Sequence, residues 1–301
     1  MNIIGKKYWY FLFSLIIIIP GIFSLLFYGL NLSVEFTGGS NLTFAFPNKV
    51  APGQLTQVSK IFNQNKIKIQ NLTASGNQVF IKSQPVDEKQ DLLITAEVKT
   101  SLGNFQQQSY ETIGPTIGSE TLRNAIYALI IASILIVLYI TWSFRSVPKP
   151  TSSFRFGVCA IIALIHDVLV LLGLFSIFGH FLGVEVDSLF VTAALTVIGF
   201  SVHDTIVVFD RIRENLKRVG GDNFTEVVNN SILQTLDRSL NTSLTVILVL
   251  IAMLIFGGDS IRWFVVALLI GVTSGTYSSI FNASPLLVVW QDLLQKRKNR
   301  F

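Results

Sequence analysis

The sequence predicts an α-helical polytopic membrane protein with six transmembrane helices and one α+β domain between helices 1 and 2. Of its 301 residues, 50% are hydrophobic and 14% are charged, and the mean hydropathy is +0.57, whereas soluble domains carry about 25% charged residues. Six apolar segments reach the roughly 20 residues that a helix needs to cross a bilayer. A polar segment, residues 31–121, separates the first two.

The lengths and flanks of three apolar segments predict where their helices begin, end or continue. The first follows Lys6 and Lys7. It is too long for a signal peptide and no small-residue cleavage site follows it, so we expect a retained anchor. The fifth is expected to begin earlier, in the polar stretch after residue 231, and the sixth is long enough to tilt or to continue as a cytoplasmic helix. The segments are residues 8–30, 122–142, 156–178, 188–209, 239–257 and 262–290.

Lysine and arginine gather in alternate loops, which predicts the orientation. They stand before the first span and after the second, fourth and sixth, whereas residues 179–188 and 257–262 contain few. By the positive-inside rule, both termini and the loops 143–155 and 210–230 are cytoplasmic, and residues 31–121 are outside. The net charge of +5 therefore follows from topology and requires no nucleic-acid partner. The basic residues are Lys6, Lys7, Arg145, Lys149, Arg155, Arg211, Arg213, Lys217, Arg218, Lys296, Arg297, Lys298 and Arg300.

The outer segment has the pattern of a β-α-β-β-α-β domain with no net charge. Alternating stretches predict strands and helical spacing predicts two helices, the second ended by Gly103. Ser75 and Gly76 are expected to form the tight turn between the second and third strands. This order is the ferredoxin-like split βαβ, whose sheet edges could pair with an extended chain or could serve packing alone. The expected strands are 41–46, 68–74, 77–83 and 105–113, and the helices 54–64 and 86–102.

The composition also narrows the chemistry. The single cysteine, Cys159, lies in an apolar run and supports neither a disulfide framework nor a metal cluster. The sequence contains no GxxxxGK[ST] loop, so we expect no ATP-driven motor in this chain, no cofactor and no enzymatic activity. The expected organisation is residues 1–30 for the cytoplasmic N-terminus with helix 1, 31–121 for the outer domain, 122–290 for helices 2–6 with their cytoplasmic loops, and 291–301 for a basic cytoplasmic tail.

Charged residues stand inside two of the apolar spans. The fourth contains IGFSVHDTIVVFDRIREN, residues 198–215, in which Ser201, Asp204 and Thr205 share one helix face. Asp204 is about 9 Å of helix inside the basic end, where an unpaired charge costs roughly 2.5–3.5 kcal/mol. The third span holds His166 and Asp167 near its midpoint.

The fifth and sixth spans carry further polar residues. In the sixth, Gly271 and Gly275 have the GxxxG spacing that permits close helix approach, and Ser274, Ser278 and Asn282 accompany them. We interpret this face as a packing surface. In the fifth, a polar stripe opposes a face of leucine, isoleucine and valine. The stripe consists of Ser231, Gln234, Thr235, Arg238, Asn241, Thr242 and Thr245.

Each charged residue has a structural and a functional interpretation. The His166–Asp167 pair is either a satisfied hydrogen bond or a proton relay, His203 could donate to a nearby carbonyl, and Arg238 could reach the cytoplasmic interface. The shorter carboxylate side chain of Asp204 cannot reach the cytoplasmic interface. Ionisable residues within membranes mark proton or ion paths. A guanidinium favours the charged form of a nearby carboxyl, so movement of Arg238 would switch Asp204 between holding and releasing a proton.

Five motifs together resemble the SecF family of bacterial protein-export subunits. The 198–215 segment is similar to the family's span-4 motif, with His203 where asparagine is more usual. The motif after helix 1 (Glu35, Phe36, Thr37, Gly38 and Gly39) has Glu35 in place of the usual aspartate. The others are IGPTIGSE (113–120), ALIHDVLV (163–170) and NNSILQTLDRSLNTSLT (229–245), so that the resemblance covers nearly the whole chain.

The resemblance implies a partner, an energy source and a location. SecF works with SecD in a twelve-span complex, similar in fold to the resistance-nodulation-division exporters, beside the SecYEG channel. YajC and YidC are further implied partners. The complex is expected to use the proton-motive force to promote late preprotein translocation, in a bacterial plasma membrane or a thylakoid-type membrane. Asp204 and Arg238 match the family's proton-coupling positions. Residues with a possible relay or structural role are His166, Asp167, His203, Ser201, Thr205, Asn241 and Thr242.

Two other classes of protein compete with this one. Half of a proton-coupled small-molecule exporter of the same superfamily is the first, but a single outer domain of ~90 residues lacks the bulk for a drug pocket and exit duct. A purely structural membrane scaffold is the second, and it leaves the charges at Asp204 and Arg238 unexplained. Co-purification with a SecD-like subunit separates the three.

Overall fold

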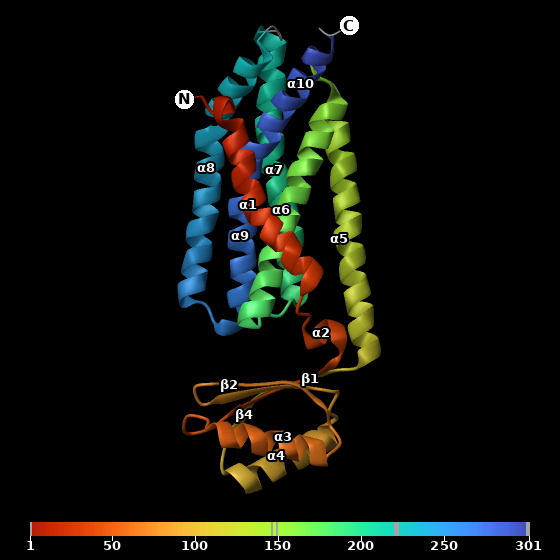
Figure 1. The fold of residues 1–301 in the computed structure, drawn as a ribbon, viewed down its shortest axis with the longest axis vertical. Helices are drawn as coiled ribbons and strands as arrows, with labels where there is room; N and C mark the ends of the chain where they lie inside the picture. Colours follow the sequence, from red (N-terminus) through yellow and green to blue (C-terminus); the bar gives the residue numbers. More distant parts are fainter. Residues whose placement is uncertain (1, 146, 149, 220–222, 299–301) are drawn as a thin grey trace. The chain divides into compact units, whose positions relative to one another are not determined.

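A computed structural model describes the chain except at residues 1, 146, 149, 220–222 and 299–301. The chain folds into two compact units (Figure 1). The membrane unit comprises Met1–Asn31 and Ala128–Phe301, and the soluble unit comprises Leu32–Tyr127. Of the predicted basic positions, Lys149 and Arg300 lie outside the described residues, as does the middle of the 210–230 loop.

The described residues contain six helical segments long and apolar enough to cross a membrane, as predicted. The fifth begins well before its apolar part, because Asn223 accepts the backbone N–H of Glu226 and caps the helix. The helices are α1 (Lys7–Phe27), preceded by η1 (Ile4–Lys6), α5 (Pro115–Ser143), α6 (Ser153–Leu182), α7 (Ser188–Val219), α8 (Phe224–Phe256), and α9 (Arg262–Ser278) with α10 (Ser284–Lys298).

The sixth span is interrupted, which the sequence pattern did not predict. A π-helical turn, η3 (Ser279–Ala283), separates α9 from α10. Pro285 has no N–H to donate to the preceding turn, and the Ser284 hydroxyl instead donates to the Ser279 carbonyl at 3.2 Å. Such turns are rare and recur at functional sites.

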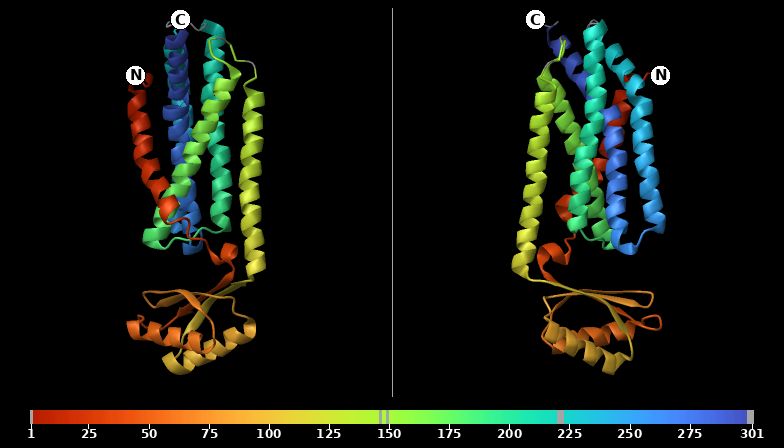
Figure 2. Two further views of the ribbon diagram at one scale, coloured as in Figure 1. Left: turned by 45° about the vertical axis from the view of Figure 1, so that its right-hand side comes forward. Right: turned by 180° about the vertical axis from the view of Figure 1, so that it is seen from behind.

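Glycines set the closest helix contacts in the membrane unit. A Cβ on Gly173 of α6 would lie 2.7 Å from the Gly21 Cα of α1. Cβ atoms on Gly271 and Gly275 of α9 would lie 2.0 Å and 3.0 Å from side-chain atoms of α7. The predicted GxxxG packing face is therefore confirmed, with α7 as its partner. Figure 2 shows α5 running along the edge of this unit, and only 6% of its most apolar window is buried.

The soluble unit has the predicted element order β-α-β-β-α-β. Its sheet is antiparallel with the strand order β2-β3-β1-β4, and α3 and α4 cover one face (Figure 1). The β2–β3 turn is shifted by one residue from the predicted Ser75-Gly76, because Ser75 still pairs with Gln78 and Gly76 supplies the positive φ of +61°. The elements are α2 (Val34–Thr37), β1 (Gly39–Ala45), α3 (Pro52–Gln64), β2 (Ile69–Ser75), β3 (Gln78–Ser83), α4 (Glu88–Leu102) and β4 (Gln106–Ile113).

Candidate functional site

Buried polar side chains gather where α6, α7, α8 and α9 pack together. α7 packs against the other three helices, and α9 also packs against α6 and α8. Within a bilayer, hydroxyl and carboxyl groups at such contacts must be satisfied by one another. The hydrogen bonds of the two buried aspartates therefore define what each can do.

Asp204 lies on the buried face of α7 and is 3% exposed. The Thr276 hydroxyl of α9 lies 3.2 Å from its Oδ2 atom and can donate to it. The same hydroxyl can donate to the Val272 carbonyl at 2.9 Å, so the bond to Asp204 competes with a shorter one. The Ser243 hydroxyl of α8 lies 2.5 Å from that of Thr276. A chain of hydroxyl groups thus connects the carboxyl to two neighbouring helices.

Asp167, on α6, has a different environment and is 0% exposed. Hydroxyls of Ser201 on α7 and Ser278 on α9 donate to its Oδ2 atom at 2.5 Å and 2.6 Å. Its Oδ1 atom accepts from the Ser274 hydroxyl of α9 at 2.7 Å and lies 2.9 Å from His166 Nδ1. These five residues form the Asp167 cage. Each carboxylate oxygen has two polar partners, and the cage ties three helices together.

His166 closes the cage on its α1 side. Nδ1 is the ring nitrogen that faces Asp167, and whether it donates or accepts depends on the tautomer of the imidazole. The other ring nitrogen, Nε2, is buried and has no hydrogen-bond partner among the described residues. The imidazole lines a largely apolar cavity of about 320 Å³, with Ser14 of α1 and Asn282 of η3 among the lining residues.

Arg238 does not meet Asp204. Among the described residues, no hydrogen bond or ion pair joins these two side chains, and Arg238 lines an open cleft of about 540 Å³ that also contains Asp210 and Arg211. The reason is that α8 buries only about every fourth residue, so the predicted stripe divides between two sides of the helix. Ser231, Thr235, Ser239 and Ser243 are buried, whereas Arg238, Asn241, Thr242 and Thr245 are exposed.

The remaining predicted residues are partly brought together. Ser201 belongs to the Asp167 cage, and the Thr205 hydroxyl lies 2.8 Å from that of Ser279 in the π-helical turn. His203 is exposed, as are Asn241 and Thr242, and the Thr242 hydroxyl donates to the Arg238 carbonyl at 2.9 Å. The structure therefore joins His166, Asp167 and Ser201 and leaves His203 and the candidates of α8 apart.

The motif after the first span forms a capped turn that leads into β1. Ser33 accepts the backbone N–H of Glu35 at 3.3 Å and begins α2. Phe36 is buried, and the Thr37 hydroxyl donates to the Ser33 carbonyl at 3.1 Å. The turn is thus fixed by its own side chains before the two glycines.

The two glycines allow a close backbone approach. Gly38 and Gly39 have φ angles of +70° and +137°. A Cβ on Gly38 would lie 2.6 Å from the Pro115 Cα, and a Cβ on Gly118 would lie 2.6 Å from the Gly38 nitrogen. The motifs at 34–40 and 113–120, separated by the whole sheet in sequence, therefore pack directly against each other within the soluble unit.

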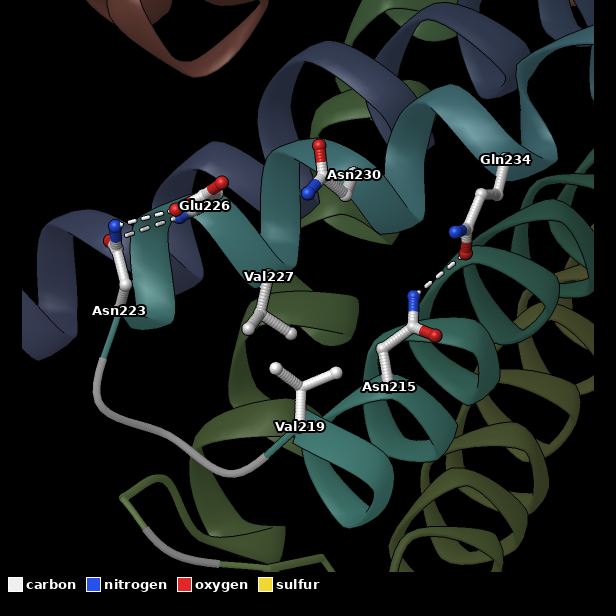
Figure 3. Close-up of a pocket in the computed structure, with 7 residues that line it drawn as sticks. All are labelled: Asn215, Val219, Asn223, Glu226, Val227, Asn230 and Gln234. Atoms are coloured by element: carbon white, nitrogen blue, oxygen red, sulfur yellow. Dashed lines mark hydrogen bonds between the residues drawn. The ribbon is translucent and has the colours of Figure 1, made fainter.

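A polar groove of about 380 Å³ lies between the last turns of α7 and the first turns of α8 (Figure 3). Asn215 donates to Gln234 at 2.8 Å, and Asn223 donates to Glu226 at 2.8 Å. The side-chain amides thus satisfy one another and the acid, and they hold the ends of the two helices together.

Sequence reasoning missed some residues and misread others. Ser274 and Ser278 were expected on a packing face, although their spacing of four residues also predicts two donors on one side of a helix. Thr276, Ser243 and Ser279 were not singled out. Hydroxyl residues hydrogen-bond to their own helix as readily as across helices, so their type alone gives no signal.

Comparisons with known families cover most of the chain. The family described as "Protein export membrane protein SecD/SecF, C-terminal" matches residues 94–293, and the "SecD/SecF GG Motif" matches residues 23–46. The second match contains the glycine turn of the soluble unit.

Similar proteins agree with the family match. The "Protein translocase subunit SecF" of Thermobaculum terrenum is 45% identical over 302 residues, covering 97% of this chain and 94% of the relative. The "Protein translocase subunit SecDF" of Bacillus subtilis is 35% identical, covering 95% of this chain and 38% of the relative. The crystal structure of SecDF, "a translocon-associated membrane protein", from Thermus thermophilus has a TM-score of 0.82 and 31% identity, over 97% of this chain and 39% of that one. The chain therefore belongs to the SecD/SecF family of protein export membrane proteins.

Proposed function

We propose that the chain, together with a SecD subunit, uses the proton-motive force to promote late preprotein translocation, and that Asp204 binds the coupling proton. The observation that carries the proposal is the buried Asp204 carboxyl in a membrane-spanning helix. The Thr276 hydroxyl beside it can donate either to this carboxyl or to the Val272 carbonyl. An unpaired charge at such depth costs roughly 2.5–3.5 kcal/mol. The hydroxyls of Thr276, at 3.2 Å, and Ser243 both contact Asp204, and the Thr276 hydroxyl also donates to the backbone, so the surroundings of Asp204 differ from those of Asp167.

Arg238 acts, in this proposal, from the interface with the SecD subunit. It shares an exposed face of α8 with Asn241, Thr242 and Thr245, and polar groups exposed on a spanning helix need a neighbouring helix to satisfy them. The SecDF relatives, whose chains are much longer than this one, support SecD as that neighbour. An approach of Arg238 toward Asp204 would favour the charged carboxylate and release its proton.

The proposed setting is a bacterial plasma membrane, with both termini in the cytoplasm and the soluble unit outside. The strand order β2-β3-β1-β4 of that unit supports a ferredoxin-like domain. Its edge strands β2 and β4 could pair with an extended preprotein. The SecYEG channel and preproteins are the proposed partners in export.

The proposal is tested by export of a preprotein into inverted membrane vesicles, with and without an imposed proton gradient. Asp204→Asn keeps the size of the side chain but cannot titrate. It should abolish the gradient-dependent part of export while ATP-driven translocation continues. Asp204→Glu should keep part of the response, and Arg238→Lys should be impaired because an ammonium lacks the planar fork of a guanidinium.

Asp210→Asn is the matched control on the same helix. Its side chain is 56% exposed and pairs with Arg213 at 2.5 Å, so its loss should leave the gradient response unchanged. A full gradient response in Asp204→Asn would show that the charge at Asp204 is structural, and the proposal would be wrong.

A further inference from the structure

We propose that Asp167 is a positioning residue. Through hydrogen bonds with Ser201, Ser274 and Ser278, its carboxyl holds α7 and α9 in the register that places Asp204 beside Thr276. This inference rests on the proposed function, because it concerns the same proton-binding carboxyl.

The hydrogen bonds of the cage fix the Asp167 carboxyl in place. Each oxygen of Asp167 has two polar partners at 2.5–2.9 Å, from α6, α7 and α9. The titratable groups on the elements packed around the cage are His166 within it, Tyr277 of α9, whose ring lies 6.4 Å from that of His166, and His203 and Asp204 of α7, of which His203 is exposed. Asp204 is contacted by the hydroxyls of Thr276 and Ser243, and Thr276 also donates to the backbone, so its position depends on where α9 and α8 place these two residues.

The same contacts fix the position of Asp204. On α7, Ser201 and Asp204 are three residues apart and share a face. On α9, Ser274 and Ser278 flank Thr276 in sequence. A slide of α9 by one residue, about 1.5 Å, would separate Ser274 and Ser278 from Asp167 and Thr276 from Asp204 together. The two helices also pack closely here, since a Cβ on Gly275 would lie 3.0 Å from the Ser201 Cβ.

The cage lies where α9 is least regular. Ser278 is the last residue of α9 before the π-helical turn. Ser279, the first residue of the turn, lies 2.8 Å from the Thr205 hydroxyl and donates to the Gly275 carbonyl at 2.8 Å. A π-turn is a point at which a helix can change register, so the anchors of Ser278 and Ser279 on α6 and α7 hold the register that Asp204 needs.

The test measures the proton on Asp204 directly. A hydrophobic carbodiimide reacts with protonated carboxyls within membranes, and mass spectrometry locates the modified residue. Labelling of Asp204 is followed across pH in membranes containing this chain and its SecD subunit. Asp167→Asn, and a Ser274→Ala/Ser278→Ala double variant that keeps the carboxyl, should each shift the labelling midpoint of Asp204 by about half a pH unit or more. Gradient-dependent export should fall about 3- to 10-fold without being abolished.

Ser133→Ala on α5 is the matched control, since its hydroxyl donates within its own helix, to the Leu129 carbonyl at 2.7 Å, and has no bond to another helix among the described residues. It should leave the midpoint in place. A drop in thermal stability of both cage variants with an unchanged midpoint would overturn the inference and make the cage merely structural. Labelling of Asp167 itself, with export abolished in Asp167→Asn as in Asp204→Asn, would overturn it in favour of a relay. A full gradient response in Asp204→Asn would instead contradict the proposed function, and the positioning role of Asp167 would then be wrong as well.

Discussion

Asp167 and Asp204 are the same residue type at similar burial, yet their surroundings differ. Asp167 has three serine hydroxyls from other helices and the His166 imidazole of its own helix around it, whereas Asp204 has the hydroxyls of Thr276 and Ser243 and competes with a backbone carbonyl for the first. The stabilisation of a buried charge depends on the number and shortness of such contacts. The function of a residue in this bundle is therefore decided by the helices opposite it.

In the soluble unit, the effect of substituting Gly38 should likewise depend on the elements packed against it, which gives a prediction. Gly38→Ala and Gly76→Ala both place a Cβ at a positive φ, +70° and +61°, which costs about 1–2 kcal/mol. Only at Gly38 does the new Cβ also meet backbone, 2.6 Å from the Pro115 Cα, whereas nothing lies within 4 Å at Gly76. We expect Gly38→Ala to cost about 1–3 kcal/mol more. Hydrogen exchange of the β1 and β4 amides measures the difference, and equal losses in the two variants would contradict the packing argument.

The membrane-spanning helices could be predicted from the apolar composition of the sequence, whereas the interruption of the sixth helix could not. Six apolar stretches predicted six spans. α8 extends its apolar part toward the N-terminus, but it begins at Phe224, before the stretch after residue 231 in which its start was expected. The π-helical turn at Ser279–Ala283 had only Pro285 as a signal, because prolines within membrane helices cause kinks as well as turns. The face that α8 buries could not be read from its polar stripe either, since hydroxyl residues stand on both its buried and its exposed sides.

The crossing of α1 and α6 gives a prediction at the scale of elements. Gly173→Ala would place a Cβ 2.7 Å from the Gly21 Cα, so the two helices must move apart and lose contacts along their length. We expect a loss of about 1–3 kcal/mol and a lower thermal unfolding midpoint in detergent. Gly199→Ala on α7 is the control, because nothing lies within 4 Å of its Cβ, and its midpoint should be unchanged or higher. A control that lost as much as Gly173→Ala would argue against the crossing.

The whole molecule was predictable in its parts and less so in its contacts. Hydrophobic periodicity and turn residues were enough to predict the order of strands and helices in the soluble unit. The distribution of lysine and arginine among the loops was enough to propose an orientation. The Asp167 cage joins residues more than 100 positions apart, such as Asp167 and Ser278, and no local pattern records that distance. Arg238 and Asp204 looked like partners because both are charged and lie on successive spans, but the direction of a side chain depends on helix rotation, which packing sets.

The orientation of the whole chain gives the last prediction. The soluble unit should face the outer side of the membrane, because the loops on the opposite side of the spans carry the lysines and arginines. Ser75→Cys, on the exposed end of β2, should react with a membrane-impermeant maleimide added to intact spheroplasts. Thr225→Cys, exposed at the start of α8, should react only after the membrane is opened. The native Cys159 is 0% exposed and should contribute little background. Labelling of Thr225→Cys but not Ser75→Cys in intact spheroplasts would reverse the orientation, and the basic loops would then face outward against the bias that insertion imposes.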